Sequence, residues 1–244
     1  MKPRIACLAA WALALMLPLS AQAQKIGFAL SEQDAFLSLL RDGVVEAAKT
    51  SGATLLMRDA KNSQATQLDQ VRDLVSQKVD AIIIVPVNTE ATRVITNMVT
   101  QAGIALVYAN RKPVDFDQLP TGTALVASDE KVSGTLQTEE VCRRLNGRGN
   151  ILVLMGSLAN EAARTRTQDI EDVLARPACS AIQIVDKRLG HWDRSRARKI
   201  VRNVVTAGAV SGKRLDAVVA NNDEMALGAI EALKASRVWT PDFI

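Results

Sequence analysis

From Gln24 onward the chain alternates short apolar runs with helical patterns, and this alternation limits its fold more than any other feature. The apolar runs are rich in Ala, Val, Ile and Leu, as expected of strands that are buried on both faces of a sheet. Short loops join them to the helices, which predicts right-handed βαβ units and a parallel sheet covered by helices on both sides. The predicted strands are 25–30, 53–58, 79–85, 104–109, 123–127, 150–155, 181–188 and 216–220.

The alternation breaks over residues 113–122, which contain two prolines and Gly122, and then begins again. Val79–Ile83 and Leu215–Val219 share the pattern apolar-Asp-Ala-apolar-apolar, so the second half of the chain repeats the first. We predict an α/β protein with two doubly wound, Rossmann-like parallel-sheet lobes, separated by a hinge and an interlobe cleft. The N-terminal lobe is expected over residues 24–127 and the C-terminal lobe over residues 128–244.

The chain ends at Pro241–Ile244, where the pattern would begin another buried strand. We therefore expect the second lobe to be incomplete and the sequence to be truncated at its C-terminal end. A truncated lobe would also lack some ligand contacts, so we expect this chain to bind its ligand weakly.

The first residues have the pattern of a secretory signal peptide over residues 1–23. Lys2 and Arg4 precede an apolar run from Ile5 to Leu19, and small residues in an Ala-x-Ala arrangement follow at Ala21 and Ala23. The apolar run is too short to span a bilayer comfortably. We expect cleavage after Ala23 and a soluble, exported protein.

Removal of residues 1–23 takes away Lys2 and Arg4 and lowers the formal net charge of +4 by two. The remaining charge is too small for a nucleic-acid-binding surface. Two cysteines remain, Cys142 and Cys179, and both are expected at the end of the second lobe opposite the cleft. In an oxidising compartment they can pair; the alternative is one buried and one exposed thiol.

The sequence offers no set of residues for catalysis. His191 is the single histidine, which excludes a His-based metal site and weakens any Ser/His/Asp arrangement. No Gly-x-Gly-x-x-Gly follows the first strand, and no Walker-type loop occurs. We therefore expect no cofactor, no metal and no enzymatic activity.

Polar side chains instead follow the predicted strands, at the carboxyl ends where open α/β sheets bind ligands. Carboxylates accept hydrogen bonds from hydroxyls, guanidinium groups donate them and amides do both, which suits a polyol. At least one residue of Asn221–Asp223 is expected to cap the next helix, and another to face the ligand. The full set is Asp34, Asn110, Arg111, Arg164, Arg166 and Asn221–Asp223.

Two aromatic residues stand near these strand ends, in a chain with only 3% aromatics. Phe36 and Trp192 offer flat apolar surfaces for the C–H faces of a sugar ring. The alternatives are an ordinary core position for Phe36 and a surface-loop anchor for Trp192.

The sequence around these residues resembles that of the periplasmic ribose- and galactose-type binding proteins, which belong to the type I periplasmic binding protein family. The resemblance rests on six segments in the same order: Lys25–Leu30, Ala35-Phe36, Asp42-Gly43, Ala127–Asp129, Ala162–Arg166 and Asn222–Ala229. It implies a periplasmic, monomeric protein that binds a monosaccharide or related polyol and delivers it to an inner-membrane ABC permease. It carries the ligand contacts onto Asp34, Phe36, Asn110, Arg111, Arg166, Trp192 and Asn222.

Three other functions are compatible with two such lobes. A signalling receptor would present its closed form to a chemoreceptor or sensor kinase. The effector domain of a sugar-responsive repressor is disfavoured by the signal peptide and by the lack of a helix-turn-helix. An exported α/β enzyme is the last alternative.

Overall fold

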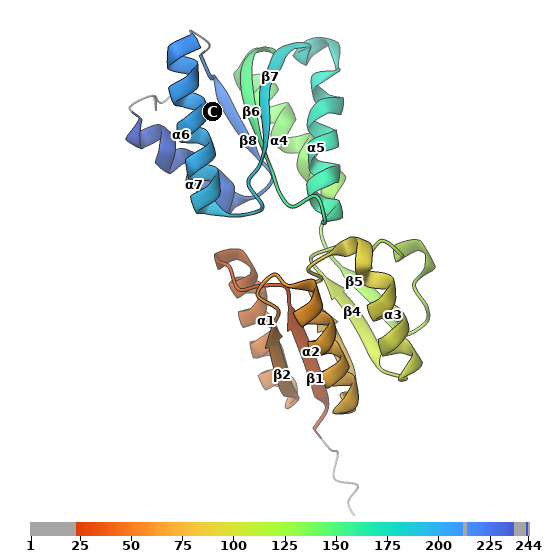
Figure 1. Cartoon of the computed structure of the whole chain (residues 1–244). Helices are drawn as coiled ribbons and strands as arrows, with labels where there is room; N and C mark the ends of the chain where they lie inside the picture. The colour runs from red at the N-terminus through yellow and green to blue at the C-terminus, as the bar shows by residue number, and fades with distance from the viewer. Residues whose placement is uncertain (1–22, 212–213, 237–242, 244) are drawn as a thin grey trace, which may run out of the picture.

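The computed structural model describes residues 23–211, 214–236 and 243, which form two α/β lobes, one above the other in Figure 1. The predicted signal peptide, except Ala23, lies outside the described residues, and so do Pro241, Asp242 and Ile244. Among the residues that the structure describes, no helix is long and apolar enough to cross a bilayer.

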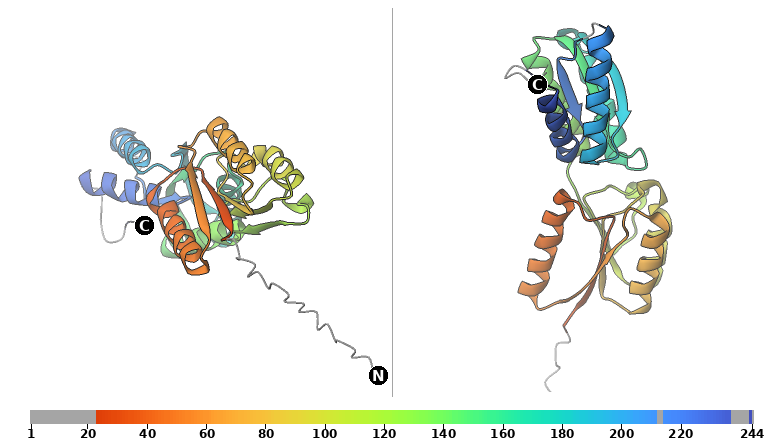
Figure 2. Two further views of the ribbon diagram at one scale, coloured as in Figure 1. Left: turned by 90° about the horizontal axis from the view of Figure 1, so that it is seen from below. Right: turned by 60° about the vertical axis from the view of Figure 1, so that its left-hand side comes forward.

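The first lobe is a five-stranded parallel sheet in the order β2-β1-β3-β4-β5. Helix α1 covers one face, and α2 and α3 cover the other (Figure 2). Phe28 and Leu30 of β1 pack with Leu37 of α1, whereas Ala29 packs with Leu74 of α2. Its elements are β1 (Lys25–Leu30), α1 (Ala35–Ser51), β2 (Thr54–Asp59), α2 (Gln64–Ser76), β3 (Ala81–Ile84), η1 (Thr89–Ala91), α3 (Thr92–Gln101), β4 (Ala105–Ala109), η2 (Phe116–Gln118) and β5 (Thr123–Val126).

The second lobe is a parallel sheet in the order β7-β6-β8. Helices α4 and α5 pack on one face and α6 and α7 on the other, so each face has its own apolar core. The described residues of this lobe form three strands against five in the first lobe, as expected of an incomplete lobe. Its elements are α4 (Glu130–Arg144), β6 (Arg148–Met155), α5 (Glu161–Leu174), η3 (Pro177–Cys179), β7 (Ala181–Leu189), α6 (Arg194–Ser211), β8 (Ala217–Ala220) and α7 (Asp223–Ala235).

The sequence repeat corresponds to a repeated hydrogen-bond arrangement at the start of the central strands. Oδ2 of Asp80, before β3, accepts from the backbone N–H of Lys25 at 2.7 Å, and Oδ2 of Asp216, before β8, accepts from that of Asn150 at 2.9 Å. The N–H of each aspartate donates back to the carbonyl of the same partner, at 2.8 and 2.9 Å. These aspartates therefore fix the register of equivalent strands in the two lobes.

Helices α6 and α7 approach each other closely at Gly228. A Cβ atom at this position would lie 2.2 Å from the carbonyl oxygen of Arg194, so no larger residue fits without separating the two helices. This contact holds the start of α6, and the loop before it, against the start of α7.

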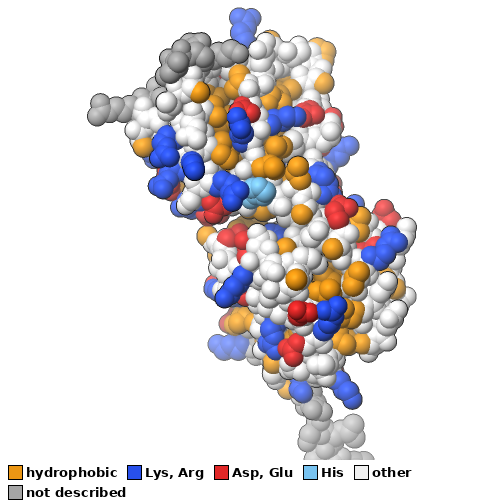
Figure 3. Space-filling view, in the orientation of Figure 1, with side chains coloured by type: hydrophobic (Ala, Val, Ile, Leu, Met, Phe, Trp, Pro, Cys, Tyr) orange, Lys and Arg blue, Asp and Glu red, His pale blue; other side chains and the backbone are white. Residues whose placement is uncertain are grey.

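The helical segment after β3 begins at Thr89 with the 3₁₀ turn η1 and becomes an α-helix only at Thr92. Thr89 is engaged by the second lobe: its N–H and its hydroxyl donate to the carbonyl of Ala159 at 3.0 and 3.1 Å, and its Oγ1 accepts from the N–H of Glu161 at 3.0 Å. Arg164 also forms an ion pair with Glu90. We call this set of bonds the lobe contact; the space-filling view narrows to a waist between the two lobes (Figure 3).

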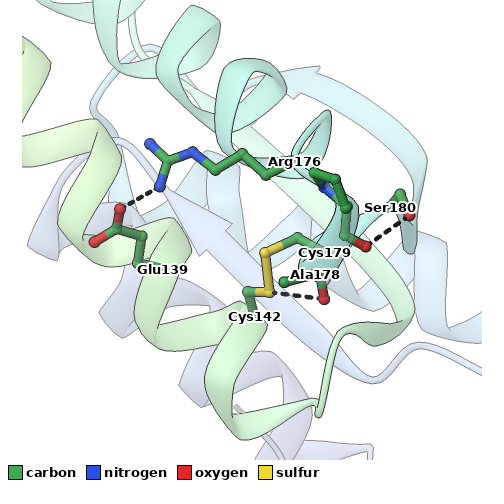
Figure 4. Close-up of a disulfide and its surroundings, with 7 residues drawn as sticks. Glu139, Cys142, Arg176, Ala178, Cys179 and Ser180 are labelled. Carbon is green, nitrogen blue, oxygen red and sulfur yellow. Dashed lines mark hydrogen bonds and ion pairs between the residues drawn. A yellow bond between two sulfur atoms is a disulfide. The ribbon is translucent and has the colours of Figure 1, made fainter.

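Cys142 and Cys179 form a disulfide with their Cα atoms 5.6 Å apart (Figure 4). It joins the C-terminal part of α4 to η3, and an ion pair between Glu139 and Arg176 lies beside it. Both cysteines are buried. Of the two alternatives that the sequence left open, the pairing is therefore the correct one.

Candidate functional site

A cavity of about 420 Å³ lies between the lobes and is lined by residues of both. This volume is within the range typical of small-molecule sites. Its lining includes every residue that the sequence analysis selected as a ligand contact: Asp34, Phe36, Asn110, Arg111, Arg166, Trp192 and Asn222.

The N-terminus of α1 supplies a carboxylate and an aromatic ring to the cavity. Oδ1 of Asp34 caps the helix by accepting from the N–H of Leu37 at 2.6 Å. Phe36 is 49% exposed, so the alternative of an ordinary core position is wrong. The cap thus fixes the direction of Asp34 and leaves the Phe36 ring open to the cavity.

Asn110 and Arg111 follow β4. Asn110 has φ of 65°, a left-handed conformation that asparagine tolerates better than most residues. Arg111 is 7% exposed; its Nη1 donates to the carbonyl of Pro86 at 2.8 Å, and its Nη2 lies 3.7 Å from Oε1 of Glu32. Burial lowers the pKa of the Arg111 guanidinium and raises the pKa of the Glu32 carboxyl, and the attraction between the two groups opposes both shifts. The Arg111 charge is therefore balanced inside the first lobe.

Arg166 lies on α5 and is also paired. Its Nε donates to Oε2 of Glu130 on α4, and its Nη1 donates to the backbone carbonyl of Asn221. The partner of Arg166 is thus neither of the acidic residues nearest to it on α5, Glu161 and Asp169. Glu130 is 7% exposed and the Arg166 side chain 19%.

Trp192 lies in the loop before α6 with φ of 68°, directly after His191 with φ of 54°. Two successive left-handed residues that are not glycine are uncommon and cost conformational energy. Gly156 provides space for the indole, since a Cβ there would lie 2.2 Å from the ring. The Trp192 carbonyl accepts from Nδ2 of Asn222 at 3.3 Å. The ring is therefore held by the second lobe while it lines the cavity.

The residues Asn221–Asp223 have different roles. Asn222 caps α7 by accepting from the N–H of Met225 at 3.0 Å, which confirms the expectation of a cap in this segment. Asn221 is 2% exposed and accepts from the N–H of Gly156 at 2.9 Å, so its side-chain oxygen serves the fold. Asn222 and Asp223 line the cavity.

The sequence model of the periplasmic binding protein domain matches residues 26–244. The chain belongs to the periplasmic binding protein family. The resemblance and the type I fold expected from the sequence are thereby confirmed, and membership of this family implies a periplasmic location.

Individual members of this family are also similar to the chain in sequence. A Rhizobium meliloti protein named as rhizopine-binding is 46% identical over 227 residues, which cover 92% of this chain and 72% of that protein. The xylitol-binding protein of Mycolicibacterium smegmatis is 31% identical, over 89% of this chain and 60% of its own. A solved structure is also similar, that of an ABC transporter solute-binding protein from Bacillus halodurans with bound myo-inositol. Its sequence is 38% identical, its TM-score is 0.79, and the match covers 88% of this chain and 72% of that chain. The chain thus spans 60 to 72% of the length of these relatives.

The cavity of this periplasmic binding protein also contains polar residues that the sequence analysis did not select. Glu130 is the first residue of α4, and nothing in the sequence pattern distinguishes it from an exposed helix residue. Ser128 and Glu224 lie within two of the segments on which the resemblance rests, so those segments were the available signal. The full set is Ser128, Glu130, Ser133 and Glu224.

Arg164, noted with the strand-end residues in the sequence, belongs to the lobe contact rather than to the cavity lining. Glu224 forms a bidentate pair with Arg194, at 2.9 and 3.0 Å. Within the described part of the chain, no group of three or more His, Cys, Asp or Glu side chains lies close enough to hold a metal ion.

Proposed function

We propose that this chain is the substrate-binding component of an ABC importer, which binds an uncharged monosaccharide or related polyol between its lobes and delivers it to an inner-membrane permease. In this proposal residues 1–23 are removed on export, and residues 24–127 and 128–244 are the two domains. Binding involves no chemical step. The ligand contacts both lobes only when they are together, so it shifts the population toward the closed state.

The observation that carries the proposal is the composition of the cavity lining. Asn110 and Asn222 provide groups that both donate and accept, and Asp34 provides an acceptor, as ligand hydroxyls require. Phe36 and Trp192 provide flat apolar surface from opposite lobes. This combination fits a ring that has polar edges and apolar faces.

The charge balance favours an uncharged ligand over a sugar phosphate or sugar acid. Arg111 is paired with Glu32 and Arg166 with Glu130, so each guanidinium beside the cavity already has a carboxylate. An anionic ligand would have to compete with these carboxylates and would also face Asp34, Asp223 and Glu224. Uncharged hydroxyls meet no such repulsion.

A thermal-shift screen tests the proposal. The probes are myo-inositol, xylitol, ribose and galactose at millimolar concentration, with glucose 6-phosphate and galacturonate as charged controls. Millimolar ligand makes weak binding visible, because stabilisation grows as RT ln(1 + [L]/Kd). We expect at least one uncharged polyol to raise the Tm and neither anion to do so. A response to the anions alone would refute the proposed ligand class.

A further inference from the structure

Asn160 occupies the N-cap of α5, but its side chain does not cap the helix. It is 2% exposed and makes no hydrogen bond to the first turn, although asparagine at this position normally accepts from the N–H of the second or third helical residue. In the amide orientation that satisfies both of its polar atoms, Oδ1 accepts from the indole Nε1 of Trp192 at 3.1 Å and Nδ2 donates to the carbonyl of Val87 at 3.2 Å. The amide therefore joins a cavity residue of the second lobe to the backbone of the first.

The first lobe takes over part of the capping at the start of α5. The hydroxyl oxygen of Thr89 accepts from the N–H of Glu161, the first residue of the helix. Thr89 thus satisfies the N–H of the first helical residue across the lobe contact, while the Asn160 amide makes its two bonds elsewhere. Both arrangements depend on the lobes being together.

Other contacts also restrain the Trp192 indole, which packs against the apolar core beneath α6 and α7. Gly156 provides space beneath the ring, and Asn222 holds the backbone carbonyl of Trp192. Neither contact fixes the polar edge of the indole, which the bond to Asn160 does.

We propose that Asn160 is a positioning residue, which holds the Trp192 indole in the cavity and couples its orientation to the contact between the lobes through Val87. The relevance for ligand binding rests on the proposed function; the coupling itself does not. When the lobes separate, the Asn160 amide loses the Val87 carbonyl, and with it one of the two bonds that fix the plane of the amide. Trp192 is thus fully oriented only when the lobes are in contact.

Fluorescence of Trp192 without ligand tests the coupling directly. Replacing Trp11 and Trp239 by Phe makes Trp192 the only tryptophan of the chain. In this background Asn160→Leu removes both amide bonds at similar volume. The matched control Thr89→Val removes the neighbouring hydroxyl bonds of the lobe contact and retains Asn160.

We expect Asn160→Leu to shift the Trp192 emission to the red and to raise its acrylamide quenching constant. Thr89→Val weakens the lobe contact but keeps the Asn160 amide, so it should change both in the same direction by a smaller amount. An unchanged emission and quenching constant in Asn160→Leu, or an equal change in Thr89→Val, would overturn the proposal. Should Asn160→Leu fail to fold, solvent exchange of the Trp192 indole N–H in the unsubstituted chain decides, by ¹⁵N NMR. Exchange slower than in a free indole supports the proposal, and exchange at the free rate overturns it.

Calorimetry with myo-inositol measures the ligand affinity, which distinguishes a positioning role of Asn160 from a merely structural one. One hydrogen bond of this kind corresponds to an affinity change of about three- to tenfold, which we expect for Asn160→Leu in the chain that retains Trp192. In a Trp192→Phe background, which keeps a ring but lacks the indole N–H, the same substitution should have little effect. An equal loss in both backgrounds overturns the role of Asn160. If the parent chain binds none of the polyols, the proposed function fails while the fluorescence result still stands.

Discussion

The buried ion pair between Arg166 and Glu130 gives a prediction whose size follows from the structure. Arg166→Met keeps the length of the side chain but removes the charge and the donors to Glu130 and to the Asn221 carbonyl. It leaves a carboxylate that is 7% exposed without its partner. Breaking a buried pair on one side costs about 3–5 kcal/mol, and the 19% exposure of Arg166 puts this case toward the lower end of that range.

Replacing both partners should cost much less than this single change. In Glu130→Gln/Arg166→Met no charge is left buried, so we expect the double variant to recover more than about 1.5 kcal/mol relative to the sum of the single variants. Urea unfolding followed by circular dichroism at neutral pH measures each free energy of unfolding, provided that the m-value stays constant.

The matched control lies on α4, the helix that also carries Glu130. Arg143 pairs with Glu140 on α4, but its side chain is 69% exposed. Water screens such a pair, so Arg143→Met should leave the urea midpoint unchanged. If Arg166→Met has no larger effect than Arg143→Met, or if the effects of Glu130→Gln and Arg166→Met simply add in the double variant, Arg166 and Glu130 do not interact as a buried ion pair.

Three further predictions follow from single features. The disulfide closes a loop with a sequence separation of 37, so Cys179→Ser, or reductant, should lower the free energy of unfolding by about 2–4 kcal/mol in a urea titration; no change would count against the pairing. Asp169 is 3% exposed with its Oδ2 unpartnered, and burial raises its pKa, so its destabilising effect appears as the pH rises above the usual range of an aspartate. Asp169→Asn should therefore raise the Tm at pH 7 but not at pH 3, and an equal change at both pH values would contradict this assignment. Trp192→Ala should weaken binding of the cognate polyol by about 1–3 kcal/mol in calorimetry, and binding within twofold of the parent would exclude Trp192 as a ligand surface.

The fold was predictable because it depends on local pattern. Every predicted strand occurs within two residues of its expected bounds, since runs of small and β-branched apolar residues indicate strands buried on both faces. The repeat of Asp80 and Asp216 was visible in the sequence for the same reason. The 3₁₀ turn η1 was not predictable in this way, because bonds from Thr89 to the second lobe alter the first turn of this helical segment. No local pattern carries that information.

The residues of the cavity were predictable, but their pairing was not. Polar residues that follow parallel strands gather at one edge of the sheet, so position alone brought Asp34, Asn110 and Asn222 to the cavity. The partners of the arginines are distant in sequence: Glu130 is 36 residues from Arg166. Whether an arginine binds a ligand alone or beside a carboxylate depends on how helices pack. That the seven site residues contact the ligand stays a prediction.

The pairing of Arg166 does not remove it from ligand binding. A guanidinium carries five N–H donors in one plane. The bonds to Glu130 and to the Asn221 carbonyl use Nε and Nη1, and among the described residues no bond from Nη2 is found. Glu130 fixes the plane of the group, and the N–H groups of Nη2 remain for hydroxyls in a cavity that Arg166 lines. A carboxylate that orients and neutralises the guanidinium therefore prepares it for an uncharged hydroxyl and makes it a poor site for a phosphate.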